Sequence, residues 1–120
     1  KILFVDDEPM LVDIGKSTLE KIGYSVTTKT DSTEALDLFK SDPSQFDLVI
    51  TDQTMPNIPG SQLANKLLQV RPDIPIILCT GHSSTINEIK AQKIGIKEYT
   101  MKPVNKAVIA KLIRKVLDTA

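Results

Sequence analysis

The 120-residue chain is short of several residue types, and each shortage narrows the class of protein that it can be. Its one cysteine, Cys79, excludes an internal disulfide and fits a reducing compartment. Its 15 basic and 15 acidic side chains cancel, so no net charge draws it to nucleic acid or to a membrane surface. No apolar run approaches the roughly 20 residues of a membrane span, and no secretory signal is visible. These absences leave one compact domain with an ordinary core.

Short apolar runs rich in β-branched residues alternate with longer amphipathic segments, which is typical of buried parallel strands separated by helices. We expect strands at 2–5, 24–28, 48–52, 74–80 and 97–101. We expect helices from Pro9 to Gly23, from Asp31 or Ser32 to Asp42, from about Leu63 to just before Pro72, from the turn at 81–84 to near Gly95, and from Lys106 to Leu117.

The spacing of apolar residues also predicts which helix faces point inward. The expected inward residues are Leu11, Ile14, Thr18 and Ile22 in the first helix, Ala35, Leu36 and Phe39 in the second, Leu63, Ala64, Leu67 and Leu68 in the third, and Ile109, Leu112, Ile113 and Val116 in the last.

Five strand–helix units in succession predict an α/β fold, an open, doubly wound parallel sheet with helices on both faces. The flavodoxin-like strand order 2-1-3-4-5 would place the first and third strands side by side. Lys1 stands where an initiator Met would be expected, so we expect residues 1–120 to form one domain excised from a longer chain.

Charged side chains follow three of the predicted strands, at the point where each strand ends. Asp6 and Asp7 follow the first strand, Asp52 ends the third, and Lys102 follows the fifth. Because ligands bind beyond the carboxyl ends of such strands, we expect these side chains to converge. Crowded carboxylates repel, and either a bound proton or a divalent cation relieves the repulsion. An oxygen-only ligand set favours Mg²⁺, ahead of Mn²⁺ or Ca²⁺.

Such a site has the parts needed to accept a phosphoryl group. A carboxylate beside Mg²⁺ can attack phosphorus and form an acyl phosphate. The cation and the Lys102 ammonium would spread the charge of the transferring oxygens, and Thr80 before Gly81 offers a hydroxyl donor.

Four stretches of the chain resemble the signature blocks of response-regulator receiver domains, in the same order and at the same spacing. They are residues 5–9 (VDDEP), 52–56 (DQTMP), 80–81 (TG) and 99–103 (YTMKP). The resemblance implies that Asp52 is the phospho-acceptor and that Asp6, Asp7, Asp52 and the backbone carbonyl of Thr54 are the Mg²⁺ ligands. It also implies that Thr80 and Tyr99 form the switch and that Lys102 contacts the phosphoryl group. The peptide bond before Pro103 would be cis.

The resemblance also implies the partner and the reaction. A histidine kinase or phosphotransfer domain would donate a phosphoryl group from phosphohistidine to Asp52. The change in charge would remodel the surface of the fourth helix, fifth strand and fifth helix, which can also form a homodimer. The isolated domain would not be an enzyme, beyond assisting its own phosphorylation and dephosphorylation, and would not contact nucleic acid or membrane directly.

The parent protein is left with two interpretations. The sequences of residues 52–56 and 101–103 are most similar to those of receivers in hybrid sensor histidine kinases. Such a parent protein would place this domain in the cytoplasm and could carry a membrane anchor elsewhere in its chain. The alternative is the receiver of a DNA-binding response regulator.

Gln53, Thr54 and His82 depart mildly from the commonest family pattern, and these departures bear on the lifetime of the phosphoryl group. Cys79 is expected to fill space in the core.

Three other functions fit the sequence less well. A flavin-binding flavodoxin-like protein is disfavoured because Asp6, Asp7 and Glu8 would repel a phosphate, and the chain has no Trp and two Tyr to stack a flavin. A Mg²⁺-dependent phosphohydrolase usually carries a second acid two residues after the nucleophile, where this chain has Thr54. A docking module that is never phosphorylated is disfavoured because no acceptor-site residue is missing.

Overall fold

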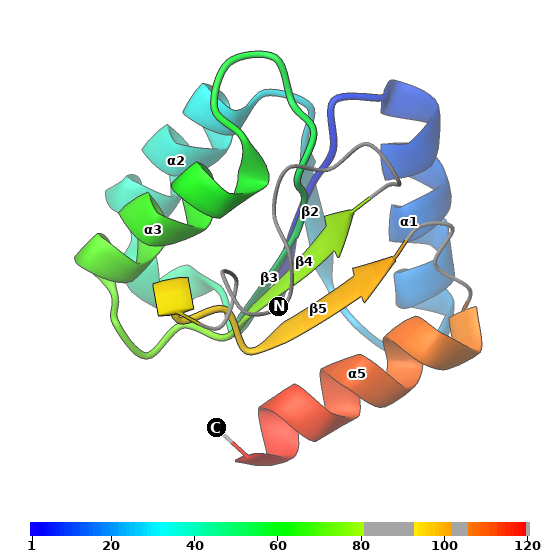
Figure 1. Cartoon of the computed structure of the whole chain (residues 1–120). Helices are drawn as coiled ribbons and strands as arrows, with labels where there is room; N and C mark the ends of the chain where they lie inside the picture. The colour runs from blue at the N-terminus through cyan, green and yellow to red at the C-terminus, as the bar shows by residue number, and fades with distance from the viewer. Residues whose placement is uncertain (81–92, 102–105, 120) are drawn as a thin grey trace.

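The computed structural model describes residues 1–80, 93–101 and 106–119 (Figure 1). In chain order the elements are β1 (Ile2–Val5), α1 (Pro9–Lys21), β2 (Val26–Lys29), α2 (Ser32–Ser41), the 3-10 turn η1 (Pro43–Gln45), β3 (Leu48–Asp52), α3 (Gly60–Val70), β4 (Ile76–Thr80), β5 (Glu98–Met101) and α5 (Lys106–Thr119). Residues 93 and 94 are helical and precede Gly95, which has a φ of 108°. They end the segment predicted as the fourth helix, whose remainder lies outside the described residues.

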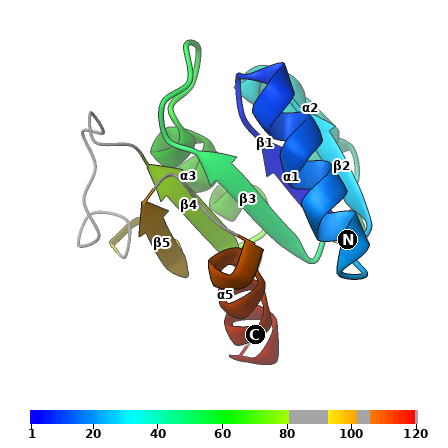
Figure 2. The ribbon, with the colours of Figure 1, turned by 90° about the vertical axis from the view of Figure 1, so that its right-hand side faces the viewer.

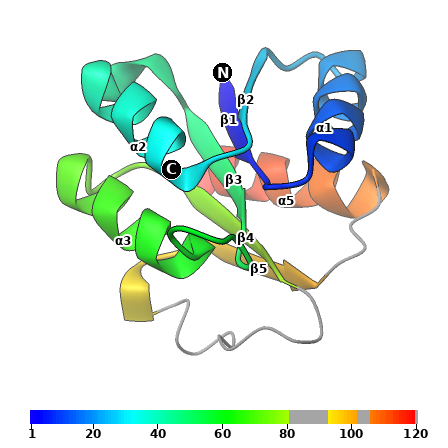
Figure 3. The ribbon, with the colours of Figure 1, turned by 90° about the horizontal axis from the view of Figure 1, so that it is seen from above.

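The strands form one five-stranded sheet in the order β2-β1-β3-β4-β5, and every neighbouring pair is parallel. Figure 2 shows the strands in this order. Seen from above, α2 and α3 cover one face of the sheet and α1 and α5 cover the other (Figure 3). The predicted doubly wound α/β fold and its strand order are therefore confirmed.

Alternate residues along each strand pack into two separate cores, because successive side chains of a strand point to opposite faces. On β1, Leu3 and Val5 join the core between the sheet and α2 and α3, whereas Ile2 joins the core between the sheet and α1 and α5. All five residues of β3 and of β4 are buried. The centre of the sheet is thus covered on both faces, and ligands can approach it only at its edges.

The inward face predicted for the first helix is wrong at Ile14, whereas Leu11, Thr18 and Ile22 are half-buried as expected of residues near the core. Val12 and Leu19 are the buried residues of this helix, whereas Ile14 is 56% exposed. The reason is Gly15, which lies on the buried stripe but contributes no side chain to the sequence pattern. The ring of Phe4 occupies the space beside it, since a Cβ built on Gly15 would lie 2.7 Å from Cζ of Phe4.

The inward faces of the other described helices agree with the sequence pattern. The buried members are Ala35, Leu36 and Phe39 of α2, Leu63, Ala64 and Leu67 of α3, and Ile109, Ile113 and Val116 of α5. The cap of α2 is Asp31, whose Oδ1 accepts a hydrogen bond from the backbone N–H of Thr33 at 2.7 Å. Lys115 of α5 forms an ion pair with Glu98 of β5 at 2.7 Å, and this hydrogen bond raises the pKa of Lys115.

Two strands begin two residues later than predicted. The N–H of Tyr24 bonds to the carbonyl of Leu19, so Tyr24 belongs to the end of α1 and β2 starts at Val26. Pro75 accepts a hydrogen bond from Val49 but has no N–H to donate, so β4 starts at Ile76. None of the helices in the described part of the chain is long and apolar enough to cross a membrane.

We expect Phe39→Ala to lower the free energy of unfolding by about 3–5 kcal/mol, because removal of a large buried ring leaves a cavity. Phe39 is fully buried and its ring stacks on that of Phe46, with centroids 6.4 Å apart. Urea denaturation would measure the loss. Met10→Ala is the control, since Met10 is 74% exposed and should change stability by less than about 0.5 kcal/mol. Equal effects of the two substitutions would contradict this core assignment.

Candidate functional site

The candidate site lies where β1, β3 and β4 end, at the carboxyl edge of the sheet. The register pairs Val5 of β1 with Thr51 of β3, and Asp52 with Cys79 of β4. Parallel strands in this register end together, which places Asp6 beside Asp52 and brings Thr80 to the same edge. The position of the site therefore follows from strand pairing.

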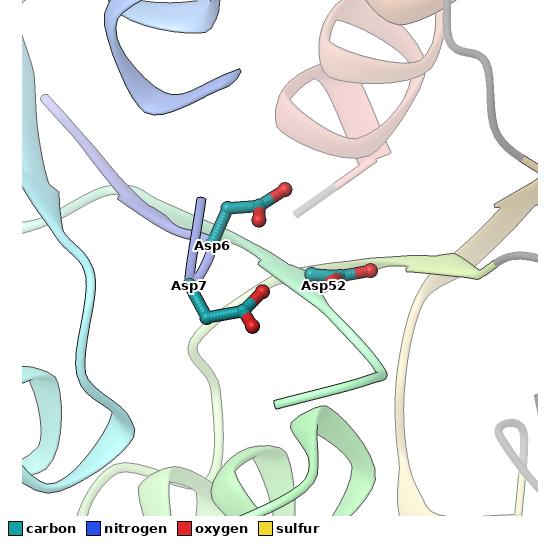
Figure 4. A group of neighbouring side chains, drawn as sticks. All are labelled: Asp6, Asp7 and Asp52. Carbon is teal, nitrogen blue, oxygen red and sulfur yellow. The ribbon is translucent and has the colours of Figure 1, made fainter. Parts of the chain in front are cut away.

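Three carboxylates meet at this edge. One oxygen from each of Asp6, Asp7 and Asp52 lies within 4.8 Å of the other two. Figure 4 shows the Asp6 and Asp7 side chains leaving the chain after β1 and extending toward the region of Asp52 at the end of β3. Asp6 and Asp52 are buried, and Asp7 is half-buried. The predicted convergence of these three residues is confirmed.

The chemistry of these donors fits a hard divalent cation. Two unit charges about 4 Å apart repel by about 4 kcal/mol at an effective dielectric constant of about 20, and three carboxylates share this small space. The N–H of Glu8 donates a hydrogen bond to Oδ1 of Asp6 at 3.1 Å. Among the residues that the structure describes, the cluster consists of carboxylate oxygens, which is the type of ligand that Mg²⁺ prefers over softer donors.

The predicted switch residues, Thr80 and Tyr99, lie on neighbouring strands. Thr80 is fully buried at the end of β4, and Tyr99 is partly buried against the core of α2 and α3. Tyr99 pairs with Leu78, two residues before Thr80. Because residues two apart on a strand share a face, Thr80 and Tyr99 lie on the same face of the sheet. This shared face agrees with the predicted switch, which stays a prediction.

The loop after Asp52 begins with Gln53, a residue whose structural role could not be predicted from the sequence. Gln53 is 5% exposed, and its side-chain Oε1 accepts a hydrogen bond from the N–H of Ser61 at 2.7 Å. Its own N–H donates to the carbonyl of Cys79, and its carbonyl accepts from the N–H of Gly60. A glutamine next to Asp52 carries little signal in a sequence, because its hydrogen-bond partners come from other elements.

Gly60 is a second residue whose importance only the structure reveals. A Cβ built on it would lie 2.1 Å from the carbonyl oxygen of Asp52. In the sequence, Pro59 and Gly60 indicate only a loop, whereas in the structure Gly60 begins α3 directly against the backbone of Asp52. Only glycine permits this approach.

Four residues named from the sequence for the site lie outside the described residues: Gly81, His82, Lys102 and Pro103. Thr54 is described, and it is exposed between two buried neighbours, Gln53 and Met55. Cys79 is buried in the core of α1 and α5, as expected for a residue that fills space.

The fold and the acidic pocket define a class of protein, a doubly wound α/β domain with a divalent-metal type of site at the carboxyl edge of its sheet. A family model, the response regulator receiver domain, matches residues 2–114. The chain therefore belongs to the response regulator receiver family, and its acidic triad is consistent with the divalent-metal site typical of receivers.

Individual relatives agree with this assignment. The chain is 38% identical over 102 residues to the response regulator SaeR of Staphylococcus epidermidis, covering 85% of this chain and 43% of that protein. It is 35% identical over 104 residues to the two-component response regulator ARR10 of Arabidopsis thaliana, covering 87% of this chain and 19% of that protein. The chain thus spans less than half the length of these curated relatives.

Solved receiver structures superpose closely on the chain. A response regulator receiver domain protein from Clostridium thermocellum has a TM-score of 0.94 at 34% identity, covering 98% of this chain and 94% of that chain. A CheY-like receiver domain protein from Methanospirillum hungatei has a TM-score of 0.90 at 32% identity, covering 98% and 93%. The likeness extends over the whole domain.

We expect Gly60→Ala to weaken Mg²⁺ binding, because the added methyl group would displace the backbone of Asp52. Isothermal titration calorimetry with MgCl₂ would measure the affinity. Gly23→Ala is the control, since Gly23 has a φ of 105° and nothing lies within 4 Å of its added Cβ. The control should lose stability through backbone strain but keep its Mg²⁺ affinity. A normal affinity in folded Gly60→Ala would contradict the proposed contact with the site.

Proposed function

We propose that this receiver accepts a phosphoryl group from a phosphohistidine of a histidine kinase or phosphotransfer domain onto Asp52. The single observation that carries the proposal is the triad of Asp6, Asp7 and Asp52, whose oxygens lie within 4.8 Å at the carboxyl edge of the sheet. Asp52 is the acceptor because it ends β3 at the centre of this sheet, with Asp6 and Asp7 beside it.

The residues proposed to hold the cation are Asp6, Asp7, Asp52 and the backbone carbonyl of Thr54. Mg²⁺ is the proposed ion, and Mn²⁺ has the same preference for oxygen ligands. When bound, such an ion neutralises carboxylate charge and stabilises the negative charge of the transferring oxygens. The carboxylates supply the affinity, and their burial limits competition from water.

The proposed transfer uses an oxygen of Asp52 as the nucleophile. A bond forms between this oxygen and phosphorus while the phosphorus–nitrogen bond of phosphohistidine breaks, and the imidazole leaves with the electron pair and takes up a proton. The product is an acyl phosphate on Asp52. Its proposed contacts are the hydroxyl of Thr80 and the ammonium of Lys102, which would stabilise charge on the phosphoryl oxygens.

The proposed output is a change of packing between β4 and β5. A hydroxyl drawn toward the phosphoryl group would vacate space beside Thr80, and Tyr99 lies on the same face of the neighbouring strand. The surface of β5, α5 and the segment before Gly95 would change with it. Such a change is a shift between two packings, driven by added negative charge and acceptor oxygens.

The sequence of residues 52–56 suggests that the parent protein is a hybrid sensor kinase. The names of the relatives instead favour a response regulator. SaeR and ARR10 are named response regulators, and the Escherichia coli relative GlrR, 32% identical over 98% of this chain and 26% of that protein, is named a transcriptional regulatory protein. We therefore propose a regulator with a separate output domain, and a hybrid kinase as the alternative.

We expect the chain to gain the mass of one phosphoryl group when it is incubated with acetyl phosphate and Mg²⁺, and we expect Asp52→Asn to gain none. Intact-protein mass spectrometry measures the gain, and EDTA should abolish it. Asp37→Asn is the matched control, because Asp37 is an exposed carboxylate of α2 and should be phosphorylated normally. A gain of the same size in Asp52→Asn would remove Asp52 from the acceptor role.

We expect Lys102→Ala to leave Mg²⁺ affinity intact but to uncouple phosphorylation from the change at the surface, because its ammonium is the proposed link between phosphoryl group and backbone. Amide hydrogen exchange of β5 and α5, with and without acetyl phosphate, measures the coupling. Lys97→Ala is the control, since Lys97 is exposed just before β5. A normal phosphorylation-dependent exchange pattern in Lys102→Ala would contradict the assigned role.

A further inference from the structure

The acceptor loop, residues 53–59, joins β3 to α3 and carries Thr54, whose backbone carbonyl is the proposed fourth protein ligand. This ligand differs from the three carboxylates. Its direction is fixed by the backbone and not by a side-chain rotamer. The loop must therefore be held in one conformation before the cation arrives, or its ordering will weaken binding.

The first restraint on the acceptor loop is Gln53. Its N–H donates to the carbonyl of Cys79 at 2.8 Å, its carbonyl accepts from the N–H of Gly60 at 2.9 Å, and its side-chain Oε1 accepts from the N–H of Ser61 at 2.7 Å. Helix α3 has no side-chain cap at Pro59, so the Gln53 side chain satisfies an N–H of the first turn that the cap leaves without a partner. Gln53 thereby closes the start of the loop onto its end.

The second restraint is Ser32, the first residue of α2. Its hydroxyl donates to the carbonyl of Ile58 at 2.7 Å and also lies 3.5 Å from the sulfur of Met55. Ser32 is 2% exposed and Met55 is 7% exposed, so water does not compete for these contacts. The hydroxyl therefore fixes the middle of the acceptor loop to an element on the α2 and α3 side of the sheet.

Thr54 lies between the two restraints and is itself exposed, whereas Gln53 and Met55 on either side of it are buried. We propose that Gln53 and Ser32 are positioning residues that hold the Thr54 carbonyl in place for a divalent cation. The inference rests on the proposed function, because it assigns the loop's contacts to the metal site. Residues that hydrogen-bond to metal ligands and orient them typically contribute to the metal affinity, so their substitution weakens metal binding.

The test compares two pairs of substitutions in the 120-residue chain. Gln53→Met keeps the size of the side chain and removes only the hydrogen bond that Oε1 accepts from the N–H of Ser61. Ser32→Ala keeps the helix and removes the contacts of the hydroxyl with Ile58 and Met55. Isothermal titration calorimetry with MgCl₂ should show a dissociation constant raised on the order of tenfold in each. Circular dichroism and thermal melting would establish that both variants are folded.

Matched controls exist at the opposite edge of the sheet. Gln45 donates from Nε2 to the carbonyls of Leu38 and Asp42, both at 3.0 Å, and Ser41 donates to the carbonyl of Leu38 at 2.6 Å. Ser41→Ala removes the same type of hydrogen bond as Ser32→Ala, and Gln45→Met, like Gln53→Met, removes glutamine side-chain bonds to the backbone. Loss of stability is the only expected effect of these two control substitutions. Their Mg²⁺ dissociation constants should equal that of the unmodified chain.

A kinetic measurement separates positioning from simple loss of structure. In phosphorylation by acetyl phosphate, Gln53→Met and Ser32→Ala should raise the Mg²⁺ concentration needed for half-maximal rate, while the rate at saturating Mg²⁺ stays unchanged. A lower saturating rate with unchanged half-saturation would overturn the inference, as would an unchanged dissociation constant in the folded variants. Ser32→Cys, which keeps a weak donor, replaces Ser32→Ala if that variant does not fold, with an intermediate dissociation constant expected.

The unmodified chain distinguishes failure of this inference from failure of the proposed function. If the unmodified chain binds Mg²⁺ and both Gln53→Met and Ser32→Ala bind it equally well, the positioning role alone is overturned. If the unmodified chain does not bind Mg²⁺, the proposed metal site is overturned and the positioning role with it.

Discussion

Repulsion among three carboxylates, held together by strand pairing, is the constraint on which the functional part of this structure depends. Asp6 and Asp52 are buried at adjacent strand ends, and the hydrogen bonds of the sheet prevent them from separating. The stability of the hydrophobic cores on both faces of the sheet offsets this unfavourable arrangement. Because the carboxylates cannot move apart, their negative charge is available for binding a cation.

The surroundings of the triad are correspondingly rigid. Gly60 brings the start of α3 against the carbonyl of Asp52, Gln53 closes the acceptor loop, and Ser32 ties that loop to α2. These contacts come from three different elements, and each one either limits how far the backbone of Asp52 can shift or fixes the loop beside it. A rigid pocket next to Thr80 and Tyr99, on the same face of β4 and β5, is a suitable arrangement for passing a local change to a distant surface.

Most of the fold could be predicted because the pattern of apolar residues is strong. The strands at Leu48–Asp52 and Ile2–Val5 were predicted with their observed bounds, since each is a short β-branched run followed by acidic residues. The inward face of α1 could not be predicted, because Gly15 contributes no apolar side chain to the pattern although it lies on the buried stripe. The starts of β2 and β4 were missed because hydrogen bonding at Tyr24 and Pro75, and not hydropathy, decides where each strand begins.

The sequence by itself determined the class of fold and the identity of the three acidic residues, because hydrophobic periodicity and charge at strand ends are local properties of the chain. The strand order was expected by analogy with flavodoxin-like sheets, and the pairing of the strands confirmed it. Only the tertiary structure decided that the three carboxylates lie within 4.8 Å of one another. It alone also showed that Gln53, Ser32 and Gly60 support the acceptor loop. Their partners are distant in the chain or are backbone atoms, and a hydrogen bond to a backbone carbonyl or N–H leaves no mark on the partner's residue type.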